Sequence, residues 1–158
     1  MQVLLFCYKN HYPANYLLLL AFTILQSFAI ASICATYQAS GDGAIVLHAF
    51  VLTTFIFLSL TVFTLQTRID FTFMGAGLFS CLTILILWGI INAIFGWHTT
   101  WLYSLFGAIL FCLFILYDTS QLIYTYGYDD YVIASIDLYL DFLNLFLYIL
   151  SLLGKRND

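Results

Sequence analysis

Long apolar stretches separated by short polar segments dominate the pattern along this chain. Residues 12–41 and 71–97 carry no charged side chain, and a membrane-spanning helix needs about 20 mostly apolar residues. The pattern predicts five full membrane helices, preceded by a short apolar segment, residues 1–9, that resembles the last part of a further helix. The predicted ranges are 14–37, 44–66, 72–96, 101–125 and 131–153.

The composition agrees with lipid as the solvent for this chain. Hydrophobic residues make up 64% of the sequence and charged residues 8%, against about 25% charged residues in a soluble domain. We therefore predict one all-α transmembrane domain over residues 1–158. The net charge of -4 argues against nucleic acid as a partner, because binding it needs a basic face.

The four basic residues predict the orientation in the membrane. Short connections make neighbouring helices antiparallel, so Lys9 and Arg68 fall on one side, and the positive-inside rule makes that side cytoplasmic. The loop at residues 126–130 returns to the same side. Lys155 and Arg156 would join them only if the last helix re-entered, and two charges leave both topologies open.

Aromatic residues gather at the predicted helix ends, where an interfacial belt is expected in membrane proteins. They are Trp97, Trp101, Tyr103, Tyr126, Tyr128 and Tyr131.

Three aspartates inside predicted spans are the candidate functional residues. A carboxylate inside a bilayer is costly, so it usually faces a cavity or a partner and marks an ion or proton path. At 1.5 Å per residue, Asp118 lies roughly 10 Å deep in its helix and Asp141 roughly 15 Å deep in the next. The two carboxyl groups are therefore expected to meet. Asp137 lies one turn closer to water.

Polar residues recur at helical spacing around these aspartates, so each of the last two helices should carry one polar stripe. The first stripe contains Asp118, Gln121 and Thr125, and the second contains Asp137, Asp141, Asn144, Tyr148 and Ser151. Because polar side chains avoid lipid, the stripes are expected to face each other or a common cavity. Gln121 and Asn144 would then either hydrogen-bond between helices or line the path.

A carboxyl pair of this kind could act as a pH switch. Two carboxyls in contact tend to share one proton and titrate as a unit. Loss of the proton leaves two anions that repel each other and attract Ca²⁺, which prefers oxygen ligands. The alternative is that Asp118 and Asp141 only pin two helices together, and that Asp137 is a solvated rim residue.

Motifs for other chemistry are missing from the sequence. Cys7, Cys34, Cys81 and Cys112 lie apart in apolar stretches, which is typical of buried small side chains. There is no HExxH, GxSxG, P-loop or dinucleotide motif. We expect no enzyme activity and no bound cofactor; Asp118 and Asp141 would hold calcium only transiently.

Three segments together resemble the Bax-inhibitor/lifeguard family, and the Golgi anti-apoptotic and lifeguard branch in particular. ASIDLYLDFLNLFLYILSLLG, residues 134–154, is similar to the family's C-terminal signature. FILYDTSQLI, 114–123, resembles its penultimate-helix motif, and FTLQTRIDFTFMGAGLF, 63–79, its central loop and next helix. The likeness extends from about residue 6 to residue 154.

The resemblance implies a seven-helix fold with the last helix at its centre. It also implies a pH-sensitive calcium leak from intracellular stores, with suppression of apoptosis, in the Golgi, endoplasmic reticulum or another endomembrane. The family's di-aspartyl pH sensor falls on Asp118 and Asp141. Channels or apoptosis regulators would be additional partners beside the lipid bilayer and calcium.

The sequence departs from the family pattern near its beginning. We expect the first helix and most of the second to be missing, together with an acidic residue that would pair with a basic one. Lys9 is the candidate remnant of that latch, and Gln26 stands where many relatives are expected to have Glu. A non-conducting adaptor and an inactive truncated copy are therefore the alternatives to a channel.

Overall fold

The computed structural model describes residues 11, 13–96 and 100–156 of the chain. Within them lie five helices that are long and apolar enough to cross a membrane. They are α2 (Ala14–Ala39), α3 (Gly43–Gln66), α4 (Gly75–Phe95), α5 (Thr100–Tyr124) and α6 (Tyr131–Arg156), with short 3₁₀ turns at Phe71–Met74 and Tyr128–Asp130. The prediction of a polytopic helical bundle is therefore confirmed. The apolar segment 1–9, Lys9 and Trp97 lie outside the described residues.

Helix boundaries follow local chemistry. Pro13 stands at the N-cap of α2, where its missing N–H costs nothing. Gly41 in the α2–α3 turn and Gly96 after α4 adopt positive φ angles of 89° and 62°, a conformation that glycine reaches without strain. The Asp70 carboxylate accepts a hydrogen bond from the Thr72 amide at 2.9 Å, which starts the 3₁₀ turn before α4.

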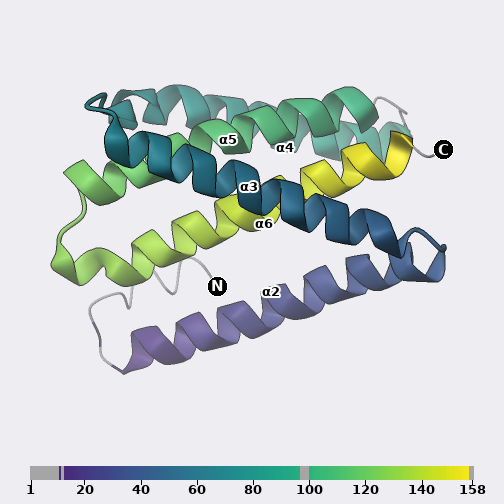
Figure 1. The fold of residues 1–158 in the computed structure, drawn as a ribbon, viewed down its shortest axis with the longest axis horizontal. Helices are drawn as coiled ribbons and strands as arrows, with labels where there is room; N and C mark the ends of the chain where they lie inside the picture. Colours follow the sequence, from purple (N-terminus) through teal and green to yellow (C-terminus); the bar gives the residue numbers. More distant parts are fainter. Residues whose placement is uncertain (1–10, 12, 97–99, 157–158) are drawn as a thin grey trace.

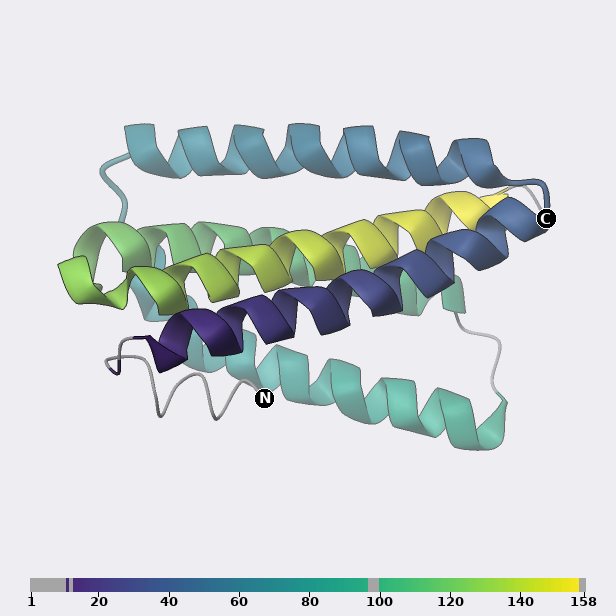
Figure 2. The same ribbon diagram turned by 90° about the horizontal axis from the view of Figure 1, so that it is seen from below.

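Consecutive helices run in opposite directions across one bundle (Figures 1 and 2). The α2–α3 turn, the start of α5 and the end of α6 lie at one end, here called the Ser40 end. The end of α3 and the α5–α6 loop lie at the other, called the Arg68 end. Helix α6 packs on α5, α3 and α2, which agrees with the expected central position of the last helix.

The last helix crosses the whole bundle without a break, which decides between the two topologies left open by the charges. Its apolar stretch Val132–Gly154 is 23 residues long, and α6 runs from the Arg68 end to the Ser40 end (Figure 1). Lys155 and Arg156 therefore lie at the end opposite Arg68. These two residues therefore do not add to the positive charge on the side that the positive-inside rule assigns to the cytoplasm.

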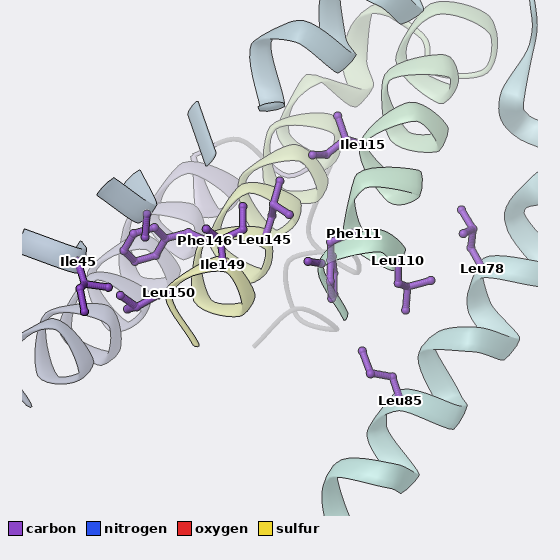
Figure 3. Packing of buried hydrophobic residues seen from close by; sticks show 12 residues of the cluster. Ile45, Leu78, Leu85, Leu110, Phe111, Ile115, Leu145, Phe146, Ile149 and Leu150 are labelled. Carbon is purple, nitrogen blue, oxygen red and sulfur yellow. The ribbon is translucent and has the colours of Figure 1, made fainter. Parts of the chain in front are cut away.

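The apolar core lies between α3, α4, α5 and α6 (Figure 3). Ile115 of α5 and Leu145 of α6 are 0% exposed, and Leu85 of α4 is 1% exposed. Large apolar side chains such as Phe28 and Phe55 point outward and are more than 70% exposed. This arrangement suits lipid, which solvates outward apolar side chains at no cost, while buried positions supply packing between helices.

Candidate functional site

A cavity of about 1070 Å³ opens between α2, α4, α5 and α6. Aromatic and aliphatic side chains form part of its wall, and polar groups from three helices and the α5–α6 loop form the rest. The polar lining comprises Gln26, Tyr103, Tyr117, Asp118, Gln121, Tyr126, Asp137, Asp141, Asn144 and Tyr148. Most residues of the two predicted polar stripes thus face a common cavity, all except Thr125 and Ser151, and Gln26 of α2 faces it as well.

Asp118 and Asp141 meet inside this cavity. Their carboxyl groups are in hydrogen-bonding contact between α5 and α6. Asp141 is 3% exposed, and its Oδ2 atom has no hydrogen-bond partner within the described part of the chain. A carboxylate has no proton to donate, so a hydrogen bond between two carboxyls requires that one of them is protonated. The shared proton expected from the sequence at this contact stays a prediction.

Asp137 lies on the same α6 stripe and also lines the cavity. Its Oδ2 atom accepts a hydrogen bond from the Tyr126 hydroxyl at 2.9 Å. Burial, this hydrogen bond and the nearby carboxylates raise the pKa of Tyr126 above its ordinary value of about 10. The phenol therefore stays protonated near neutral pH and keeps donating to Asp137, which is more enclosed than a solvated rim residue.

Gln121 and Asn144 form their hydrogen bonds within their own helices. Gln121 donates to the Tyr117 hydroxyl one turn earlier in α5, and the Asn144 amide donates to the Leu140 carbonyl at 2.8 Å. Both side chains line the cavity. That this cavity is an ion path stays a prediction. Thr125, the predicted end of the α5 stripe, is exposed at the helix terminus.

The polar contact between α5 and α6 continues beyond the aspartates towards the Ser40 end. The Ser104 and Ser151 hydroxyls are 2.8 Å apart, and the Tyr148 hydroxyl donates to that of Tyr103 at 3.3 Å. The sequence predicts Tyr103 in an interfacial belt, whereas in the structure its ring contacts Trp88 and Tyr148 inside the bundle. Helical phase could have found Ser104, because it lies about four turns before Asp118 on one face.

The described residues contain no group of three or more histidine, cysteine or acidic side chains that could hold a metal ion. The candidate ligands Asp118 and Asp141 contact each other instead. Transient calcium binding at this pair stays a prediction.

These features define a multi-pass helical membrane protein with a buried acidic pair between its last two helices. The model of the family described as "Inhibitor of apoptosis-promoting Bax1" matches residues 1–158. The chain belongs to this Bax-inhibitor family, which confirms the resemblance seen in the sequence.

Individual relatives come from a virus, an animal and a plant. The Golgi anti-apoptotic protein of vaccinia virus, strain Lister, is 46% identical over 151 residues, covering 95% of this chain and 62% of the relative. Protein lifeguard 4 of Mus musculus is 45% identical over the same coverage. Protein LIFEGUARD 4 of Arabidopsis thaliana is 40% identical over 153 residues, covering 94% and 60%.

The chain thus spans less than two thirds of the length of these relatives. The names of these relatives describe lifeguard and anti-apoptotic proteins.

Proposed function

We propose that this chain forms a pH-sensitive leak path for calcium in an intracellular membrane such as the Golgi, and that the leak suppresses apoptosis. One observation carries the proposal. Two carboxyl groups from neighbouring spans contact each other while lining a large cavity inside the bundle. Ionisable groups in membrane spans usually mark an ion or proton path.

A proton shared between Asp118 and Asp141 would keep the path closed in this mechanism. While it is shared, the hydrogen bond holds α5 against α6. Two unit charges about 4 Å apart repel each other by about 4 kcal/mol at an effective dielectric constant of about 20. Loss of the proton would therefore push the helices apart at Asp118 and Asp141. The same two anions would attract Ca²⁺, which binds carboxylate oxygens.

Neighbouring polar groups would assist the ion on its way to the pair. Asp137 and Tyr126 lie nearer the Arg68 end of the cavity, where the carboxylate would draw cations towards the pair. Gln121 and Asn144 offer amide oxygens that Ca²⁺ accepts as ligands. Lys9 as a latch remnant stays a prediction.

The link to cell survival rests on the relatives. One is named a Golgi anti-apoptotic protein and another protein lifeguard 4. A leak of this kind would lower the calcium content of the store, so less calcium would be released during a death signal.

Calcium flux into indicator-loaded vesicles containing the purified chain tests the proposal. We expect flux to rise as the pH increases from acidic to neutral values. Asp118→Asn and Asp141→Asn each remove one titrating group, so both variants should lose most of this pH dependence. Asp42→Asn is the matched control, because Asp42 caps α3 at the Ser40 end and makes no side-chain cap hydrogen bond. Equal pH profiles for the parent and both dyad variants would refute the mechanism.

A non-conducting adaptor is the second candidate function. An apolar groove of about 650 Å³ between α2, α3 and α6 favours it, lined among others by Cys34, Val46 and Phe142. A chain that carries no calcium at any pH but still protects cells through interactions in the membrane would support the adaptor. Loss of protection together with loss of flux in Asp141→Asn would support the channel.

A further inference from the structure

A second, smaller pocket continues the carboxyl-lined cavity towards the Ser40 end of the bundle. It has a volume of about 290 Å³, and hydroxyl groups of Thr100, Ser104 and Ser151 line it. Three residues, Tyr103, Asn144 and Tyr148, belong to the walls of both the pocket and the cavity. The two spaces therefore adjoin at these three side chains.

The two tyrosines meet at this junction. Their hydroxyls are hydrogen-bonded at 3.3 Å, and their ring centroids are 5.7 Å apart in an edge-to-face arrangement. Tyr103 comes from the first turn of α5 and Tyr148 from the second half of α6. The pair thus bridges the same two helices as Asp118 and Asp141, but nearer the opposite end.

Two glycines provide the space for these rings. A Cβ atom at Gly107 would lie 2.5 Å from the Tyr148 ring, and one at Gly89 would lie 2.8 Å from the Tyr103 hydroxyl. Aromatic neighbours hold the other faces: Phe111 stacks on Tyr148 with centroids 5.8 Å apart. Trp88 packs edge-on against Tyr103 at 5.7 Å. Each ring is therefore seated in a defined position between two helices.

We propose that Tyr103 and Tyr148 form a barrier between the carboxyl-lined cavity and the hydroxyl-lined pocket, and that this pocket is the exit of the path at the Ser40 end. The proposal rests on the proposed function and adds a second closure to it. Separation of α5 from α6 at the aspartates would also draw the two tyrosines apart, because each pair has one member on each helix.

Thiol labelling from the two sides of a vesicle membrane tests the barrier without relying on calcium flux. Cysteine reporters replace Gln121 in the cavity or Ser151 in the pocket, in a full chain whose native cysteines are changed to alanine. A small cationic, membrane-impermeant methanethiosulfonate is the probe. With the barrier closed, the reporter at 121 should react only from the Arg68 end and the reporter at 151 only from the Ser40 end.

Five variants then open the barrier or serve as controls. Tyr148→Phe should raise labelling of the reporter at 121 from the Ser40 end by about two- to tenfold, the change that loss of one hydrogen bond produces. Tyr148→Ala should raise this labelling further. Phe142→Ala, on the side of α6 that faces the apolar groove, should leave the labelling unchanged. Gly107→Ala should raise this labelling as Tyr148→Phe does, because the new methyl group displaces the Tyr148 ring. Gly77→Ala is its control and should leave the labelling unchanged, because a Cβ atom there meets nothing within 4 Å.

The outcomes separate this inference from the proposed function. Altered labelling in Tyr148→Ala and Gly107→Ala, without calcium flux in any chain, would support the barrier and refute calcium conduction. Calcium flux in the parent, with labelling unchanged in both variants, would support conduction and overturn the barrier. Labelling of the reporter at 121 from both sides in the parent would also overturn it.

Discussion

The contact between Asp118 and Asp141 has a consequence for stability that does not depend on ion conduction. Asp118→Leu would leave the Asp141 carboxyl, 3% exposed, without its partner. A buried polar group that loses its hydrogen-bond partner costs about 1–3 kcal/mol, whereas replacing both partners with apolar groups is nearly neutral. The double variant Asp118→Leu/Asp141→Leu should therefore be more stable than the sum of the single changes indicates.

The measurement is a double-mutant cycle on the free energy of unfolding. Helix content, followed by circular dichroism during titration with a denaturing detergent in mixed micelles, gives that free energy for the parent, both single variants and the double variant. The interaction energy of contacting residues is about 0.5–3 kcal/mol in such cycles. We expect a value in this range, with the double variant less destabilised than the sum.

A second cycle with a distant carboxyl provides the control. Asp42 lies at the Ser40 end and caps α3, so Asp42→Asn combined with Asp118→Leu should be additive within about 0.3–0.5 kcal/mol. If the Asp118–Asp141 cycle were equally additive, the two carboxyls would not be in contact, and the shared proton would have no basis.

Three further changes test the packing and the α5–α6 loop. Leu145→Ala, at a 0% exposed position, should lower the free energy of unfolding by about 2–5 kcal/mol. Its control, Leu87→Ala at a 54% exposed position, should change that free energy by less than about 0.5 kcal/mol. Equal losses for the two variants in detergent titrations would contradict the described core. Tyr126→Phe removes the donor to Asp137 and should cost about 0.5–1.5 kcal/mol. Because the pKa of Tyr126 is raised in the folded protein, its hydrogen bond contributes fully to the free energy of unfolding below pH about 10, and this contribution is lost as the pH rises further. The free energy of unfolding of Tyr126→Phe should therefore fall less at alkaline pH than that of the parent. Asp70→Ala removes the cap before α4 and should cost about 0.5–2 kcal/mol, whereas Asp70→Asn should restore most of that loss.

Several features of the fold followed from the sequence because they depend on local chemistry. The length of each uncharged stretch is enough to predict a spanning helix, and the observed bounds of α2, α3 and α5 lie close to the predicted ones. The depth of an aspartate follows from counting residues along a helix. Because α5 and α6 are antiparallel neighbours, the count also predicted that Asp118 and Asp141 would meet.

Other features depended on how the helices pack. An amphipathic ring at a helix end can face the lipid interface or the bundle, so the sequence alone could not tell that Tyr103 turns inward to Tyr148. Two basic residues were too few to decide whether α6 crosses or re-enters, and its continuous packing against α5, α3 and α2 decided this. The hydrogen-bond partners of Gln121 and Asn144 likewise depended on side-chain placement.

The sequence by itself therefore determined which segments enter the membrane and at what depth each carboxyl lies. Both depend on residue type and on the constant rise of a helix. Only the tertiary structure decided which polar groups share a cavity, because the rotation of each helix is set by packing between helices. That rotation places Asp137 with Tyr126, and it seats Tyr148 against Gly107.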